Sequence, residues 1–161
     1  MKAGNRIGLR LASLVFGVAM GIGAQAETPA WTAALGHNSS GSQEVFLAWR
    51  GAPVWQGFQP VVGGSLSSRR EAWAGAGLAY TWRGSDSSTF VRAAVMPGLY
   101  SRGNGRDLGG PVMIRSSLEA GWSLRAGGEL AIGLSHRSNA GIYAQNPGLD
   151  TLYISYSMPL R

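Results

Sequence analysis

The chain has 161 residues, 25 glycines, no cysteine and a formal net charge of +6 at pH 7. This length suits one domain, and the lack of cysteine excludes a fold held together by disulfide bonds. The cations form no basic stripe interleaved with aromatic residues, so nucleic acid is not an expected partner.

The first 26 residues have the pattern of a secretory signal peptide. Three cations within the first ten residues precede the uncharged apolar run Leu11–Ile22, and Ala24-Gln25-Ala26 is an A-x-A cleavage site. A transmembrane helix is the alternative, but a span needs about 20 apolar residues and this run is shorter. We therefore expect residues 1–26 to be removed. Residues 27–161, with 11 arginines against 8 acidic residues, would form the mature domain.

Beyond this segment the chain predicts strands rather than helices. Glycine is frequent, and segments of about ten residues alternate apolar with small or polar residues between clusters of Gly, Ser, Asn and Asp. This pattern is typical of an all-β protein and indicates an eight-stranded antiparallel transmembrane β-barrel of the bacterial outer membrane. The expected strands are Trp31–His37, Gln43–Arg50, Val54–Gly64, Ala72–Arg83, Ser88–Leu99, Val112–Leu124, Glu129–Ser138 and Leu149–Met158.

The connections between these strands are expected to alternate in length. The short ones are 51–53, 84–87 and 125–128, and the longer ones are 65–71, 100–111 and 139–148. Short periplasmic turns, longer outer loops and an even number of strands are features of a bacterial outer-membrane barrel. A soluble β-sandwich is the alternative, but it would need polar outer faces that these strands lack.

The facing of each residue follows from its parity, because side chains alternate between the two faces of a strand. In Val112–Leu124 one face is apolar and is expected to contact lipid, whereas the other carries Arg115 and Glu119 and is expected to line the interior. These two residues are expected to pair there with Arg92 of the preceding strand. A small-solute channel is not favoured, because eight strands leave an interior filled by side chains.

The same parity places three polar residues on the lipid-facing wall of the final hairpin. His136 and Ser138 continue the aliphatic face of the seventh strand, and Asp150 begins the aliphatic face of the eighth. Opposite residues of neighbouring strands have Cβ atoms about 4.5–5.5 Å apart, so Asp150 is expected beside Ser138 and within reach of His136. Polar groups on a lipid-facing wall are energetically costly, which indicates a function.

These three side chains are the parts of a serine-hydrolase site. A serine hydroxyl is a weak nucleophile, so the Ser138 hydroxyl needs a base such as neutral His136, and the Asp150 carboxylate can orient the imidazole. The bland alternative is that a histidine and a serine at the rim only solvate lipid headgroups. The motif H-x-S alone is weak evidence, since it recurs at His37-Asn38-Ser39.

Donors for the oxyanion of an acyl-transfer reaction follow the serine directly. The candidates are the side-chain amide of Asn139 and the backbone N–H groups of Ala140 and Gly141. Gly141 would let the backbone approach a substrate closely.

At these residues the chain resembles a known family. The motif H-x-S-N-A-G at 136–141, the turn Asn146-Pro147-Gly148 and an acid fourteen residues after the histidine are similar to the outer-membrane lipid A 3-O-deacylases of the PagL type. The resemblance covers roughly the last third of the chain. It implies a Ser–His–acid esterase without metal or cofactor, which removes the ester-linked acyl chain at position 3 of lipid A. It also implies Ser138 as nucleophile, His136 as base, Asp150 as orienting acid and Asn139 as oxyanion donor.

Two departures from the family pattern are visible. The family's acid is often Glu, whereas Asp150 is one methylene shorter. The chain also ends at Met158-Pro159-Leu160-Arg161, without the terminal aromatic residue common in outer-membrane proteins.

The expected partners are lipid A or lipopolysaccharide as substrate, the surrounding outer-membrane lipid and, as an open alternative, a second copy in a homodimer. Arginines in the outer loops or near the rim are candidates to contact lipid A phosphates. They are Arg69, Arg70, Arg102, Arg106 and Arg137. The competing function is a non-enzymatic small barrel with a structural or adhesive role.

Overall fold

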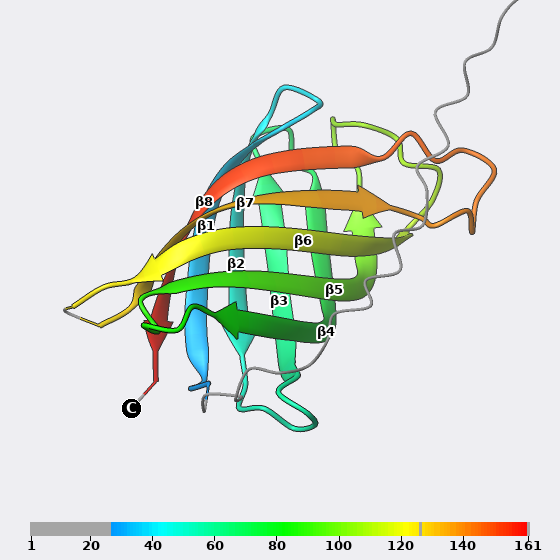
Figure 1. Cartoon of the computed structure of the whole chain (residues 1–161). Coiled ribbons are helices and arrows are strands. Elements are labelled where there is room, and N and C mark those ends of the chain that lie inside the picture. The colour runs from blue at the N-terminus through cyan, green and yellow to red at the C-terminus, as the bar shows by residue number, and fades with distance from the viewer. Residues whose placement is uncertain (1–26, 126, 161) are drawn as a thin grey trace, which may run out of the picture.

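A computed structural model of the chain describes residues 27–125 and 127–160. Eight antiparallel strands close into a barrel in which each strand pairs with its neighbours in sequence and β1 pairs with β8 (Figure 1). The strands are β1 (Ala30–Asn38), β2 (Gln43–Arg50), β3 (Gln59–Ser67), β4 (Ala72–Arg83), β5 (Thr89–Ser101), β6 (Val112–Ser123), β7 (Glu129–Ser138) and β8 (Leu149–Pro159). The expected fold is confirmed, while the expected signal peptide at 1–26 lies outside the described residues.

The two ends of the barrel differ in their connections. The described chain starts and finishes at the same end, where the Leu160 N–H donates to the Pro29 carbonyl over 2.7 Å (Figure 1). The connections 102–111 and 139–148 lie at the opposite end, which we call the long-loop end. The described residues contain no helix of the length and hydrophobicity that a membrane crossing needs.

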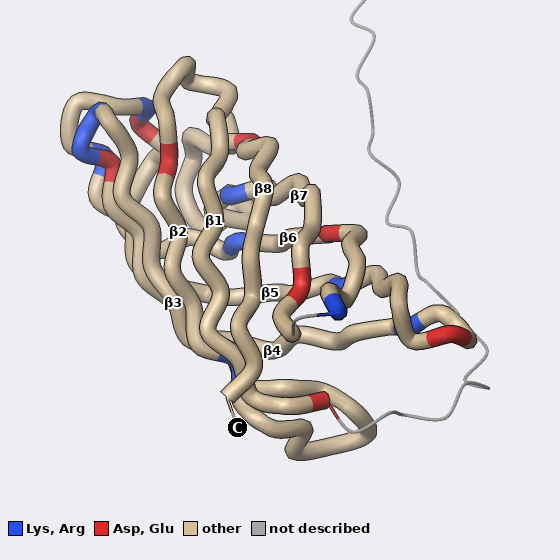
Figure 2. Tube along the Cα trace, turned by 90° about the vertical axis from the view of Figure 1, so that its left-hand side faces the viewer, with Lys and Arg blue, Asp and Glu red and all other residues tan. Residues whose placement is uncertain are grey.

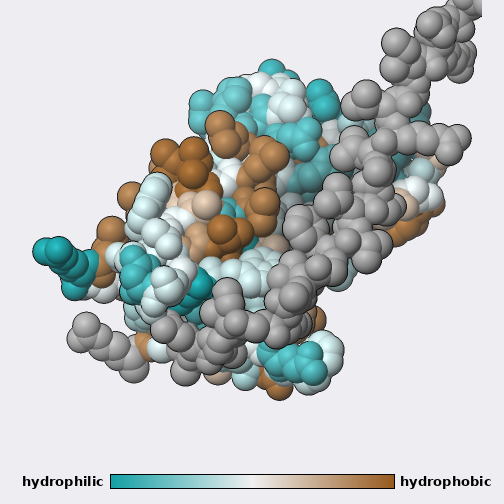
Figure 3. Space-filling view, viewed as in Figure 1, coloured by the Kyte–Doolittle hydropathy of each residue, from teal (hydrophilic) through white to brown (hydrophobic). Residues whose placement is uncertain are grey.

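The outer wall of the barrel is apolar. Burial alternates residue by residue along β8, where Thr151, Tyr153 and Ser155 are buried and Leu152 and Ile154 are 58% and 60% exposed. Figure 3 shows the result as a band of hydrophobic side chains between hydrophilic ends. A wall of this kind is stable when lipid, rather than water, surrounds it. The parity expected for Val112–Leu124 is also confirmed, with Arg115 and Glu119 buried inside.

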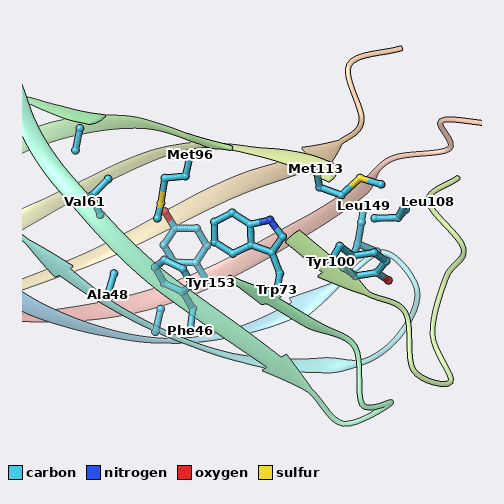
Figure 4. Close-up of a cluster of buried hydrophobic side chains, with 12 residues drawn as sticks. Phe46, Ala48, Val61, Trp73, Met96, Tyr100, Leu108, Met113, Leu149 and Tyr153 are labelled. Carbon is cyan, nitrogen blue, oxygen red and sulfur yellow. The ribbon is translucent and has the colours of Figure 1, made fainter. Parts of the chain in front are cut away.

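The interior is packed with side chains rather than open. Phe46, Trp73, Met96 and Tyr153 fill the middle of the barrel, and a second group including Tyr100 closes the long-loop end (Figure 4). Glycines make room for the large rings. A Cβ at Gly133, for example, would lie 2.4 Å from the Tyr153 ring.

Several charged residues inside the barrel form ion pairs around Glu129. Arg92 pairs with Glu119 and with Glu129, each at 2.7 Å, and Glu129 also pairs with Arg50 at 3.3 Å. Figure 2 shows such charges as short, separated segments on strands that otherwise carry none. The expected pairing of Arg92 with Glu119 is confirmed.

The expected pairing of Arg115 inside the barrel is wrong. Its guanidinium has no carboxylate within ion-pair distance among the described residues and lies instead over the Phe46 ring, 4.1 Å from the ring centroid. The reason is that Glu119 is already engaged by Arg92 on the neighbouring strand.

The expected start of the third strand at Val54 is also wrong. Gln56 and Gly57 have φ angles of 43° and 88°, so the chain reverses there, and Trp55 stacks on Phe58 with ring centroids 5.6 Å apart. β3 therefore begins at Gln59 and continues to Ser67. The connection 51–58 is therefore longer than expected, because its apolar residues form a turn with stacked aromatic rings instead of a strand. The connection 68–71 is shorter than expected, because β3 extends to Ser67.

We predict that Glu129→Gln destabilises the barrel by about 3 kcal/mol, because it removes the buried negative charge that Arg50, Arg83 and Arg92 share. Guanidinium unfolding in detergent or vesicles measures the change. The matched control is Arg102→Gln, which removes an exposed pair with Asp107 and should change stability by less than about 1 kcal/mol. Equal stability of Glu129→Gln and the wild type would contradict the prediction.

Candidate active site

The β7–β8 hairpin brings His136 and Asp150 together on the outer wall. The two residues are direct partners in the register of the hairpin, and both side chains point outward. His136 Nδ1 lies 2.7 Å from Asp150 Oδ1, and the side chains are 52% and 58% exposed. With a proton on Nδ1 donated to the carboxylate, the lone pair of Nε2 is free to accept a proton from another group.

Ser138 shares this face two residues further along β7, at its last position. Two residues of a strand span about 7 Å between Cα atoms, so the hydroxyl and the imidazole are neighbours. Among the described residues the Ser138 hydroxyl makes no hydrogen bond, and its side chain is half-buried. Hydrogen bonds between catalytic groups are often long before a substrate binds. Of the possible hydrogen bonds among the side chains of His136, Ser138 and Asp150, the structure therefore contains the one between His136 and Asp150.

Gly148 makes the space in which the His136 ring lies. This residue has a φ of +69°, and a Cβ there would lie 2.8 Å from His136 Cε1. Any larger residue would have both a strained backbone and a clash with the imidazole. The glycine of the Asn146-Pro147-Gly148 turn is therefore needed for the position of the imidazole as well as for the turn itself.

Ser39 fixes the backbone of Asp150 from the other side. Its N–H donates to the Asp150 carbonyl over 2.7 Å, and its hydroxyl accepts from the Asp150 N–H over 3.1 Å. Ser39 belongs to the second H-x-S motif, and nothing in the sequence indicates that this motif is part of the site. Closure of β1 against β8 is what places it there.

Arg106 connects three loops beneath the site. Its Nη1 donates to the Gly148 carbonyl over 3.1 Å and its Nη2 to the Ser39 carbonyl over 3.4 Å. The backbone N–H of Arg106 donates to Glu71 over 3.0 Å. The guanidinium expected to contact a lipid A phosphate thus binds backbone carbonyls on both sides of Asp150.

Glu71 anchors this arrangement as a buried carboxylate that forms no ion pair with any described residue. It accepts hydrogen bonds from the Ser42 and Ser67 hydroxyls, each at 2.8 Å, and from the Asn38 amide at 3.2 Å. Burial raises the pKa of Glu71, but the backbone N–H of Arg106 and these side-chain donors outweigh burial and hold the pKa below its ordinary value. The carboxylate therefore stays charged and holds three loops together.

The structure does not bring the Asn139 amide to the site as an oxyanion donor. This side chain is fully buried and its Nδ2 donates to the carbonyls of Leu108 and Gln145 over 2.8 and 2.6 Å. Its Oδ1 accepts from the Gly141 N–H over 2.9 Å, which occupies that donor as well. Of the three candidates, only the Ala140 N–H makes no hydrogen bond within the described chain.

The candidate phosphate-binding arginines separate into two groups. Arg137 is 2% exposed and binds Glu44 inside the barrel over 2.8 Å, so the expectation that it contacts lipid is wrong. Arg102 is paired with Asp107 over 2.8 Å. Arg69 and Arg70 are exposed, and their guanidiniums have no hydrogen bond or ion pair with any described residue.

No metal centre accompanies the site in the part of the chain that the structure describes. No three His, Cys, Asp or Glu side chains there lie close enough to hold a metal ion. Fold and site together define a transmembrane β-barrel with a His136–Asp150 pair and Ser138 on one face of its outer wall.

The comparisons with known proteins name the family. The model of the lipid A 3-O-deacylase (PagL) family matches residues 15–159, so the chain belongs to this family. It is an outer-membrane β-barrel of a family of lipid A deacylases, which are hydrolases. No curated protein matches the chain.

Two solved structures share the fold. The crystal structure of the outer membrane enzyme PagL is 20% identical, with a TM-score of 0.67 over 81% of this chain and 99% of that chain. A de novo designed transmembrane β-barrel is 10% identical, with a TM-score of 0.62 over 83% of this chain and 95% of that chain. Neither comparison supports the homodimer.

We predict that the stabilising effect of Glu71 is lost in acid. Because its pKa is lower in the folded than in the unfolded protein, its contribution is present above the ordinary value of 4.5 and disappears as pH falls through the folded value. Unfolding midpoints of the wild type and Glu71→Gln, measured from pH 7 downward, should converge below pH 4.5. A constant difference across this range would contradict the role of the charge.

Proposed function

We propose that the chain is a serine esterase that removes the ester-linked 3-hydroxyacyl chain from position 3 of lipid A in the outer leaflet. Ser138 is the nucleophile, His136 the general base and Asp150 the acid that orients it. The observation that carries this proposal is the 2.7 Å contact between His136 Nδ1 and Asp150 Oδ1 on an apolar outer wall, with Ser138 on the same face.

The reaction has two steps at one serine. His136 Nε2 takes the proton of Ser138 while the serine oxygen attacks the ester carbonyl carbon, and the tetrahedral intermediate expels the sugar 3-oxygen, which receives that proton. A water molecule then gives a proton to Nε2 and attacks the acyl-enzyme, and the 3-hydroxy fatty acid leaves as the serine regains its proton. Asp150 stabilises the imidazolium that forms in each step.

The Ala140 N–H is the oxyanion donor in this proposal. It follows the nucleophile by two residues and is free of other partners among the described residues. One such donor contributes about 3–4 kcal/mol to lowering the barrier. Asn139 instead supports the loop, because the hydrogen bonds of its side-chain amide hold the segment that carries Ala140.

A membrane lipid fits the position of the site better than a soluble ester does. The wall below the three residues is formed by Ile132, Leu134, Leu152 and Ile154, each more than half exposed. Acyl chains can lie along these side chains, so the ester group reaches Ser138 from the side without entering the barrel. The shorter acid is compatible with this chemistry, since Asp150 lies directly opposite His136 in the register.

We predict that Ser138→Ala abolishes deacylation, with a loss on the order of 10⁴-fold or more. Mass spectra of lipid A from cells that express each protein measure the loss of the acyl chain. Ser101→Ala is the matched control, because Ser101 is an exposed rim serine at the end of β5. Unchanged deacylation by folded Ser138→Ala would rule out Ser138 as the nucleophile, whereas absence of deacylation by the folded wild type would favour the non-enzymatic barrel.

Asp150→Asn should lower kcat by about 10²–10⁴-fold, because an amide no longer selects the tautomer with Nε2 unprotonated. Asp150→Glu, which restores the charge, should recover part of the activity. Purified proteins in detergent micelles with lipid A give both values. Full activity of Asp150→Asn would remove this residue from the mechanism.

A further inference from the structure

We propose that Arg69 and Arg70 form a phosphate-binding subsite for the substrate headgroup. The headgroup would extend from Ser138 across β8, β1 and β2 to the β3–β4 connection. This inference rests on the proposed function, and it assigns the direction in which the bound lipid lies. Nothing in the hydrolytic chemistry itself requires that direction.

The first support is that these two cations are free while the other rim arginines are not. Arg69 and Arg70 have no acidic partner among the described residues, and Arg69 Nη2 lies 3.8 Å from the point where a Cβ of Gly41 would be. The Arg69 guanidinium therefore leans over the β1–β2 turn, which is the side of Ser39 and Asp150. An arginine pair in this state can bind the oxygens of a phosphate monoester.

The second support is a rigid platform beneath the pair. The Ser67 hydroxyl accepts from the backbone N–H groups of Arg69 and Glu71 over 3.3 and 3.1 Å. The Ser67 carbonyl accepts from the backbone N–H of Arg70 over 2.9 Å. The Arg69 carbonyl accepts from the backbone N–H of Asn104 over 2.9 Å. A backbone fixed at this many points loses little further entropy when a ligand binds.

The third support is a polar path along the outer wall from the site to this platform. Ser39 lies against Asp150, and His37 Nδ1 is 3.4 Å from Gln43 Nε2 on β2. The Gln43 N–H in turn donates to the Ser68 hydroxyl over 3.2 Å, one residue before Arg69. Exposed polar side chains thus continue across three strands, where sugar hydroxyl and amide groups find partners.

The wall on the other side of the site is mostly apolar, although the exposed Ser116 lies opposite His136. Ser138 is opposite Ile114 on β6, and Ile114 is opposite Pro97 on β5. In the next row of the sheet, Ser116 on β6 is opposite Val95 on β5. A polar headgroup placed over β5 and β6 would therefore contact mostly hydrocarbon, so the two sides of Ser138 are chemically distinct.

An open groove for acyl chains lies below the polar path. It runs along the outside of β1–β3 between the exposed side chains of Leu35, Val45, Leu47 and Leu66, with Gly64 leaving room between them. β8 and β3 are three strand spacings apart, about 14 Å. A disaccharide headgroup with a terminal phosphate can span this distance, and its acyl chains would enter the groove.

The test compares Arg69→Gln/Arg70→Gln with the wild type on three substrates: lipid A with both phosphates and the two forms of lipid A that each lack one of them. Purified proteins in neutral detergent micelles give KM and kcat. For the fully phosphorylated substrate we expect KM to rise about tenfold, equivalent to about 1.4 kcal/mol, with kcat little changed. For the substrate that lacks the contacted phosphate, variant and wild type should agree. Arg102→Gln is the matched control and should behave as the wild type.

Two outcomes would overturn the subsite. Unchanged KM for the fully phosphorylated lipid would show that the arginines do not bind it. An equal rise for every substrate, whichever phosphate is missing, would show that they bind bystander lipid or provide only surface charge. If the wild type hydrolyses no substrate, the proposed function fails by itself. Binding of the three lipids to Ser138→Ala with and without the arginine changes then decides the subsite.

Discussion

Closure of the barrel between β1 and β8 is the constraint on which the rest of the structure depends. Within lipid no water is available to an exposed strand edge, so every backbone N–H and C=O must find a partner in the protein. The seam between β1 and β8 completes the sheet and makes an apolar outer wall possible. It also brings Ser39 beside Asp150, although the two residues are 111 positions apart in the chain. The candidate site is therefore formed by closure as well as by the final hairpin.

The long-loop end supports the site through hydrogen bonds rather than through apolar packing alone. Glu71 holds the β1–β2 turn and the loop that carries Arg106, and Arg106 in turn binds the carbonyls of Gly148 and Ser39. Among the described residues, neither the carboxylate nor the guanidinium forms a hydrogen bond with the side chain of His136, Ser138 or Asp150. Their role is to keep Gly148 under the His136 ring, where small shifts would move the base relative to Ser138.

Much of this arrangement follows from the sequence because strand parity is a strong constraint. The period of two, together with glycine-rich turns, predicts eight strands, the buried positions of Arg92 and Glu119, and Asp150 within reach of His136. The register places Asp150 directly opposite His136 rather than beside Ser138, where it was expected. Parity also predicts that Arg137 faces the interior, as the structure shows, rather than the rim where a lipid phosphate could reach it. Its partner Glu44 lies 93 residues away, so no local pattern could have identified the pair.

The errors arise where tertiary contacts decide local structure. Trp55 and Phe58 have high strand propensity, yet they stack on each other across a turn with two residues at positive φ. Asn139 follows the nucleophile in sequence, but its amide is needed by the carbonyls of two other loop residues. The supporting roles of Ser39, Arg106 and Gly148 depend on distances between loops, which no spacing in the sequence records.

The central claim is that a serine on the lipid-facing wall is a nucleophile activated by His136. Intact-protein mass spectrometry after reaction with a long-chain alkyl fluorophosphonate tests it most directly, followed by peptide mapping. The account predicts one adduct, at Ser138, which His136→Ala prevents. An unmodified Ser138 in the folded barrel, or an adduct at another serine, would contradict it.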